Sequence, residues 1–202
     1  MCLLIKLFCA IFVLVTLSSC AAPPKDTSNV CNIFEERRSW YKHAKKAAKR
    51  WSTDISMMMA IIHQESRFVQ HAKPPRRTIL WVLPGPRLSS AYGYAQARDS
   101  TWEWYQKDTG RWRSNRNDFS DAVDFVGWYI TQSRRLSNIL PNDAYSHYLA
   151  YHEGQTGFNR KTFKNKKWLL KVAQKVQRQT QRFQSQLKSC EDDLNKSWWW
   201  PF

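Results

Sequence analysis

Glu65 occupies a position at which a carboxyl group can act as an acid. It follows the apolar run from Met57 to Ile62, in which apolar residues recur at the spacing of a helix that packs into a core. A carboxyl group at the edge of that apolar surface loses hydration, which disfavours its charged form and raises its pKa. A glutamic acid that stays protonated near neutral pH is suited to general acid catalysis. The alternative interpretation is an ordinary solvated glutamate at the rim of a buried helix.

Helices must position this carboxyl group, and the hydrophobic periodicity predicts about seven of them. Ser52, Thr53 and Asp54 offer side-chain oxygens to the free amides at the start of the Glu65 helix. Helices are also predicted over residues 33–50 and 166–190, and in a short stretch capped by Ser100. Another begins at Asp118 or Ser120, and a further one begins at Pro141 and is ended by Gly154 and Gly157. This content predicts a mainly α-helical domain.

Residues 69–98 interrupt the helical pattern. Four prolines, at positions 74, 75, 84 and 86, exclude a regular helix there. Between them, residues 78–83 (TILWVL) form a short apolar segment with high β propensity. A connection this long is usually functional in a compact domain. We therefore expect a hairpin or a flap over a groove.

The composition indicates an anionic partner and excludes the common nucleotide-binding motifs. The formal net charge is +16, and such a balance favours nucleic acid, a phospholipid surface or an acidic polymer. The six glycines form no phosphate-binding loop. Eleven Trp, eight Tyr and ten Phe suit a wide groove lined by aromatic rings, although many of these rings must belong to the core.

The N-terminus predicts export. Lys6 is followed by the apolar run LFCAIFVLVTL, which is too short to span a bilayer and is typical of a signal-peptide core. The run ends in Leu-Ser-Ser-Cys20, which resembles the lipobox of bacterial lipoproteins; the alternative is a plain secretory signal with a nearby cysteine. The expected organisation is a signal peptide at residues 1–19, a lipidated tether at 20–30, a folded domain at 31–190 and a Trp-rich tail at 191–202.

Export determines how the remaining residues are interpreted. An exported protein, tied to a membrane through the lipid on Cys20, does not meet nucleic acid. The absence of Asp just after Cys20 resembles outer-membrane sorting, so we expect the periplasmic face of the outer membrane. Cys31 and Cys190 then lie in an oxidising compartment, which predicts a disulfide between the first and last helices; two free buried thiols are the alternative. The terminal SWWWPF is either an interfacial anchor or a loose or internally packed tail.

Three short segments carry the resemblance of this chain to a known family. Glu65-Ser66 ends an apolar helix, SAYGYAQA contains Gly93 and Gln96, and LAYHEG ends a tyrosine-rich helix. In order and spacing they resemble the lytic transglycosylases of the soluble-lytic-transglycosylase type, which are relatives of goose-type lysozyme. That family's pattern is Glu-Ser, then Gly-Leu-Met-Gln, then Ala-Tyr-Asn followed two residues later by Gly. The resemblance covers roughly residues 54–158 and implies a lysozyme-like α-helical domain.

Carried over by position, the resemblance implies that Glu65 is the catalytic acid and that Tyr151 lies close to it. Four departures from the family pattern are present. Tyr-Ala replaces Leu-Met before Gln96, His152 stands where the family has Asn, and Glu153 follows where a small residue is common. The chain between Glu65 and Gly93 is also longer than is usual in the family. A neutral His can both donate and accept a hydrogen bond, as Asn does, through different nitrogens. The implied substrate-binding residues are Ser66, Tyr92, Gly93, Gln96, Tyr151, His152 and Glu153.

The implied reaction needs one carboxyl group. Glu65 would protonate the glycosidic oxygen between N-acetylmuramic acid and N-acetylglucosamine, with assistance from the N-acetyl group of the substrate. The resulting carboxylate would then take the proton of the muramoyl C6 hydroxyl, and a 1,6-anhydro ring would close. Peptidoglycan is the implied partner, and no metal or cofactor takes part.

Two other functions remain open from the sequence. A hydrolase of the lysozyme type needs a second carboxylate to activate water, and Glu153, beside Asp99 and Glu103, is the candidate. A non-catalytic peptidoglycan-binding lipoprotein is the other possibility. A metal site built from histidines is disfavoured because no HExxH or similar spacing occurs. The histidines considered are His63, His71, His147 and His152.

Overall fold

The computed structural model describes residues 22–79 and 83–196, so the predicted signal peptide, Cys20 and the tryptophans of the tail lie outside the described residues. The described chain forms α2 (Val30–Glu36), α3 (Arg38–Trp51), α4 (Ile55–Ser66), β1 (Arg76–Ile79), β2 (Leu83–Arg87), α5 (Asp99–Thr109), α6 (Phe119–Ser137), α7 (Ala144–Asn159) and α8 (Lys167–Lys196). The prediction of a mainly α-helical, lysozyme-like domain is confirmed. Among the described residues, no helix has the length and apolar character needed to cross a membrane.

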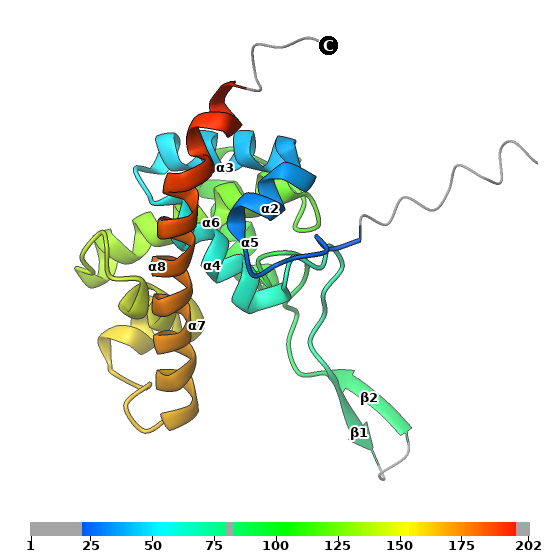
Figure 1. The fold of residues 1–202 in the computed structure, drawn as a ribbon. Coiled ribbons are helices and arrows are strands. Elements are labelled where there is room, and N and C mark those ends of the chain that lie inside the picture. Colours follow the sequence, from blue (N-terminus) through cyan, green and yellow to red (C-terminus); the bar gives the residue numbers. More distant parts are fainter. Residues whose placement is uncertain (1–21, 80–82, 197–202) are drawn as a thin grey trace, which may run out of the picture.

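Helix α4 lies at the centre of the domain (Figure 1). It packs against α3, α6 and α8, and every residue from Ser56 to Ile62 is buried. The sequence predicted a single apolar face, whereas the surrounding helices bury α4 on all sides. Asp54 begins the helix, because its side chain accepts a hydrogen bond of 2.8 Å from the backbone N–H of Met57. Ser52 instead ends α3 in a left-handed conformation.

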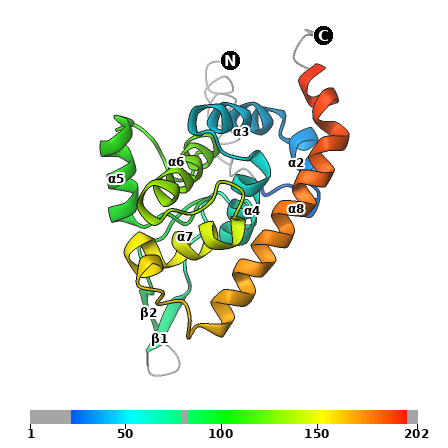
Figure 2. The ribbon, with the colours of Figure 1, turned by 90° about the vertical axis from the view of Figure 1, so that its left-hand side faces the viewer.

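The long helix α8 closes one side of the domain (Figure 2). It packs on α4, α7 and α2. Buried side chains recur along one face of α8, which explains the packing; they are Leu169, Ala173, Val176, Thr180, Phe183, Leu187 and Leu194. The predicted disulfide between Cys31 and Cys190 is present and joins α2 to α8. The helix continues to Lys196, beyond the end predicted at residue 190, because Leu194 still packs into the core.

Several helix boundaries differ from the predicted ones. The single helix expected over residues 33–50 is two helices, because Arg37 leaves helical geometry with φ −125° and ψ 66°. Helix α5 begins at Asp99, so Ser100 lies inside it and is not its cap. The predicted start of α6 is confirmed at Asp118, whose side chain accepts from the backbone N–H of Asp121.

Helix α7 differs from its prediction at both ends. It begins at Ala144 with Asp143 as its cap, so Pro141 lies in the preceding turn and not in the first helical turn. Gly154 breaks the helix with φ 73° and ψ 160°, and helical turns then resume to Asn159. A residue with a side chain rarely adopts this backbone conformation, which explains glycine at this position.

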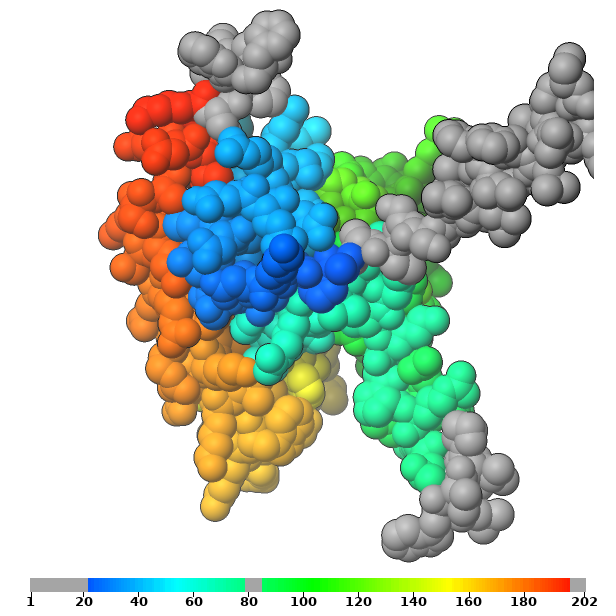
Figure 3. Space-filling model, turned by 45° about the vertical axis from the view of Figure 1, so that its right-hand side comes forward, coloured from blue at the N-terminus to red at the C-terminus, as the bar shows by residue number. Residues whose placement is uncertain are grey.

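The Pro-rich excursion is a β-hairpin, as the sequence predicted. Strands β1 and β2 pair antiparallel, with Arg76 opposite Arg87. Prolines are tolerated because both strands of a two-stranded sheet are edges. The hairpin projects from the helical body as a separate arm (Figures 1 and 3), and it does not lie flat over the helices as a flap would.

Candidate active site at the end of helix α4

Glu65 lies in the last turn of α4 and is only partly exposed. Burial raises the pKa of its carboxyl group to about 7, and a hydrogen bond from Tyr148 partly offsets this rise. The direction agrees with the one expected from the sequence. At neutral pH both the protonated and the ionised forms of Glu65 are therefore populated, which suits a group that must give and then accept a proton.

Two tyrosines of α7 face Glu65. Tyr148 and Tyr151 are one helical turn apart, so their side chains lie on the same side of α7. Burial raises the pKa of each hydroxyl, and the charge of Glu65 raises it further. Both hydroxyls thus stay protonated near the carboxyl group. The sequence placed Tyr151 in the site but missed Tyr148, although the spacing of three residues was a usable signal.

The segment after the hairpin is fixed beneath α7. The Tyr151 hydroxyl donates to the backbone oxygen of Ala95 at 2.5 Å. The side-chain amide of Gln96 donates to the backbone oxygens of Ala72 and Gly93, at 2.8 and 2.9 Å. Two of the predicted site residues, Tyr151 and Gln96, therefore hold the loop that lies beside Glu65.

Gly93 is required by the close approach of another backbone segment. It has φ 76°, and a Cβ atom there would lie 2.0 Å from the backbone oxygen of Arg116. Its N–H donates to Ala72 at 3.0 Å. Gly93 therefore shapes the loop and offers no side chain to a ligand.

Tyr92 lies at the edge of this loop between cations. Its hydroxyl is 2.7 Å from Nδ1 of His71. The ammonium group of Lys73 and the guanidinium group of Arg116 lie 5.4 and 5.5 Å from its ring centre. The half-exposed ring is thus held in place while part of it stays accessible.

Ser66 and His152 are placed differently from each other. Ser66 is buried, and its hydroxyl donates to the backbone oxygen of Ile62 in its own helix, at 3.3 Å. His152 is exposed, with Nδ1 3.0 Å from Oε1 of Glu153 and its ring edge-to-face with Trp168. Of the two, only His152 presents its side chain to a ligand.

Glu153 is held in an ion pair that the sequence did not reveal. Lys166 contacts both carboxylate oxygens, at 2.7 and 2.9 Å, and the hydroxyl of Thr162 donates to one of them. Burial alone would raise the pKa of this carboxyl group, but the hydrogen bonds from Lys166, Thr162 and His152 lower it to about 2. Its side chain is 4% exposed. Glu153 is therefore ionised and already bound, in contrast to Glu65.

The comparison with protein families adds independent evidence. The family model described as "Transglycosylase SLT domain" matches residues 8–190, which include all of α2 to α7 and most of α8. The chain belongs to the transglycosylase SLT domain family. Its activity class is thereby that of the peptidoglycan lytic transglycosylases, and its substrate class is peptidoglycan. No curated protein matches the chain, and no solved structure matches it either.

Other titratable groups of this SLT domain are engaged elsewhere. Asp99 pairs with Arg116 at 2.7 Å. Burial lowers the pKa of His63 and of His147 to about 4, so both imidazoles are neutral at physiological pH. Within residues 22–79 and 83–196, no group of three or more His, Cys, Asp or Glu side chains is arranged to hold a metal ion.

Proposed function

We propose that this SLT domain cleaves the β-1,4 bond between N-acetylmuramic acid and N-acetylglucosamine with Glu65 as the acid and base, and leaves 1,6-anhydromuramoyl ends. The observation that carries the proposal is the partly buried Glu65 carboxyl group, with a pKa of about 7, facing Tyr148. A carboxyl group with this pKa is available in both the forms that the reaction uses.

The first step uses the protonated carboxyl group. Glu65 gives its proton to the glycosidic oxygen, and N-acetylglucosamine leaves as an alcohol. The N-acetyl oxygen of the muramoyl residue attacks the anomeric carbon and forms a cyclic oxazolinium ion. This substrate assistance replaces the second carboxylate that most glycosidases need.

The second step uses the carboxylate that remains. Glu65 takes the proton of the muramoyl C6 hydroxyl, and O6 attacks the anomeric carbon. The bond to the N-acetyl oxygen breaks, which opens the oxazolinium ring and restores the acetamido group. No water is consumed, and Glu65 returns to its protonated form.

The surrounding tyrosines support these steps in different ways. The hydrogen bond from Tyr148 stabilises the ionised form of Glu65 that exists between the two proton transfers. Tyr151 bonds to Ala95 and so fixes the position of α7 over the loop of residues 92–97. We assign Tyr148 to the reacting carboxyl group and Tyr151 to the positioning of the loop.

The state of Glu153 supports a transglycosylase over a hydrolase. A hydrolase needs a carboxylate free to take a proton from water. Lys166 occupies both oxygens of Glu153, and its pKa of about 2 makes it a weak base. Of the other two candidates for this role, Asp99 is paired with Arg116 and Glu103 is exposed.

We also propose that the enzyme is exported and anchored through a lipid on Cys20 at the periplasmic face of the outer membrane. The lipobox-like sequence before Cys20 supports this proposal. Replacing Cys20 with Ala should release the protein from the membrane fraction. Recovery of the variant with the membrane would argue against the lipid anchor.

The reaction is tested on isolated peptidoglycan with the chain from residue 21 onward, which keeps the contacts of Ala22 and Lys25 with Arg37 and Glu36. Wild-type protein should release muropeptides with 1,6-anhydro ends, detected by mass spectrometry. The Glu65→Gln variant should release them about 10²- to 10⁴-fold more slowly. Reducing ends from the wild type would decide for the hydrolase.

A further inference from the structure

The positive charge of the chain is concentrated in two segments without acidic residues. Residues 66–98 contain six Lys or Arg and no Asp or Glu, and residues 154–190 contain ten Lys or Arg and no Asp or Glu. Together these segments account for the whole formal excess of +16. The rest of the chain is balanced, so the charge belongs to particular surfaces.

Each segment forms a projection. We call residues 73–79 and 83–88 the arm, which comprises strands β1 and β2 with their flanks, and residues 160–171 the foot, which joins α7 to the start of α8. The exposed cations of the arm are Lys73, Arg76, Arg77 and Arg87, and those of the foot are Arg160, Lys161, Lys164, Lys167 and Lys171. Among the described residues, none of these nine side chains makes an ion pair.

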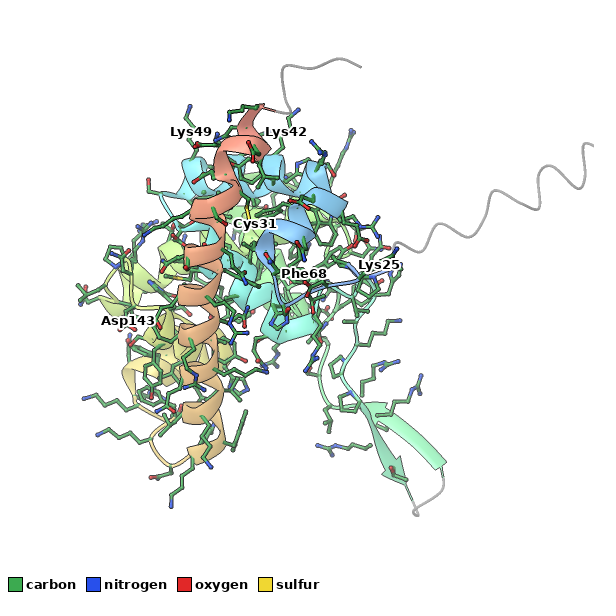
Figure 4. All side chains as sticks on the ribbon, viewed as in Figure 1. Lys25, Cys31, Lys42, Lys49, Phe68 and Asp143 are labelled. Carbon is green, nitrogen blue, oxygen red and sulfur yellow. A yellow bond between two sulfur atoms is a disulfide. The ribbon has the colours of Figure 1, made fainter. Side chains whose placement is uncertain are left out.

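The arm and the foot lie at the same end of the molecule. Both are at the bottom of Figures 1 and 2, while α3 is at the opposite end. Figure 3 shows the surface hollowed between the arm and the end of the body that contains the foot. Phe68, two residues after the end of α4, is labelled in Figure 4 above the level of the arm and the foot.

Cations near the end of α4 do not perturb the acid. His63, two residues before Glu65, has a pKa lowered first by burial and then by Lys175, Arg67 and Arg182, so the basic side of α8 reaches the end of α4. The pKa of Glu65 itself is set by burial and by Tyr148. A cation close to Glu65 would lower that pKa and remove the proton that it donates. The positive charges therefore act on parts of a ligand that lie away from the bond to be cleaved.

We infer that the arm and the foot bind the free carboxylates of peptidoglycan stem peptides on the two sides of Glu65. The inference rests on the proposed function and specifies its substrate as glycan strands that carry charged stem peptides. A strand that crosses the hollow presents peptides on both sides of the scissile bond, which matches two separate basic surfaces. Complementary charge of this kind raises the rate and the selectivity of binding more than it changes the chemical step.

Binding to sacculi tests the inference without any cleavage. In the Glu65→Gln background, we would compare the arm variant Arg76→Glu/Arg77→Glu, the foot variant Lys164→Glu/Lys167→Glu and the control Lys46→Glu/Lys49→Glu. The control replaces two exposed lysines of α3 and changes the net charge by the same amount as the other variants. These lysines lie at the opposite end of the molecule, where Lys49 is labelled in Figure 4. Affinity is measured by co-sedimentation with untreated sacculi and with sacculi whose carboxylates have been converted to neutral amides.

The expected result is a loss of affinity of about tenfold for the arm and for the foot variant, and of less than twofold for the control, on untreated sacculi. Amidated sacculi should bind all four proteins equally and weakly. An equal loss for the control, or undiminished binding to amidated sacculi, would overturn the inference. The inference would also be overturned if the arm variant bound vesicles of phosphatidylethanolamine and phosphatidylglycerol more weakly but bound sacculi with unchanged affinity. Failure of the proposed function is separate, because it shows as missing anhydro products from the wild type.

Discussion

Tyr148 on α7 donates a hydrogen bond to Glu65 on α4, and this contact links the two helices at the reacting carboxyl group. Burial pushes the pKa of Glu65 upward, while the hydroxyl of Tyr148 favours the ionised form. The result is a pKa of about 7, between that of a free glutamate and that of a carboxyl group buried without a partner. The balance between these two effects gives rise to several measurable consequences.

Replacing Glu65 with Gln should lower the rate of release of anhydromuropeptides by about 10²- to 10⁴-fold, the usual contribution of a general acid. The replacement keeps the size of the side chain but removes the transferable proton. The rate is measured from the anhydro products by mass spectrometry. Glu103→Gln is the matched control on the exposed side of α5 and should retain full activity. Equal activity of wild type and Glu65→Gln would refute the assignment of the acid.

The same replacement should stabilise the fold at high pH. Between pH 4.5 and about 7 the folded protein binds a proton at Glu65 that the unfolded chain has released, so stability falls as the pH rises through this window. Gln does not titrate and avoids the loss. The free energy of unfolding of the variant should exceed that of the wild type by about 1–3 kcal/mol at pH 8 and equal it below pH 4.5. Urea unfolding at pH 4, 6 and 8 measures the difference, and a constant difference would contradict the raised pKa.

Replacing Tyr148 with Phe should shift the pH dependence of activity. The loss of the hydrogen bond that favours the ionised form raises the pKa of Glu65, so the alkaline limb of kcat/KM against pH moves upward by about one unit. Tyr145→Phe, also on α7, is the control and should leave the profile unchanged. A loss of activity without any movement of the alkaline limb would assign Tyr148 a packing role only.

Replacing Glu153 with Gln should affect stability more than chemistry. The folded pKa of about 2 lies below the ordinary value of 4.5, so the carboxylate stabilises the fold above pH 4.5, and this contribution is lost as the pH falls through 2. The variant should be less stable by about 2–4 kcal/mol at pH 7, because Lys166 loses its partner, and the difference should close toward pH 2. Its products should still carry 1,6-anhydro ends. Abolished cleavage with unchanged stability would favour the hydrolase.

Removing the disulfide should weaken the fold without altering the site. The Cys31→Ser/Cys190→Ser variant should lose about 2–5 kcal/mol of unfolding free energy, since the bond closes a long loop. Guanidinium unfolding with and without reductant measures this, and reductant should affect only the wild type. Identical stability of the two proteins would show that the unfolded chain gains little from the loss of the bond.

The parts of the site that follow from local sequence were predictable. The apolar run before Glu65, the prolines of the hairpin and the pair of cysteines each constrain structure over a few residues or through a covalent bond. The parts that depend on packing between distant segments were not. Tyr148 meets Glu65 only because α7 crosses the end of α4, and the pair of Glu153 with Lys166 depends on the turn that follows the break at Gly154.

Gln96 illustrates the same limit for a residue that was predicted. Its position in the sequence placed it at the site, but its side-chain amide binds the backbone of Ala72 and Gly93. Sequence order indicates which residue is near the reaction, whereas the hydrogen-bond partners are determined by the folded loop. Arg116, whose backbone oxygen excludes any side chain at Gly93, comes from a segment that the sequence did not connect to this loop.

The bond between Cys31 and Cys190 encloses the arm, the loop beside Glu65 and both tyrosines within one covalent ring. A protease that cuts the projecting hairpin once would therefore produce two peptides that migrate together on a gel until a thiol is added. The helices that hold Glu65 and Tyr148 lie on opposite sides of such a cut. A single cut in the hairpin would therefore leave the enzyme as a nicked but joined molecule.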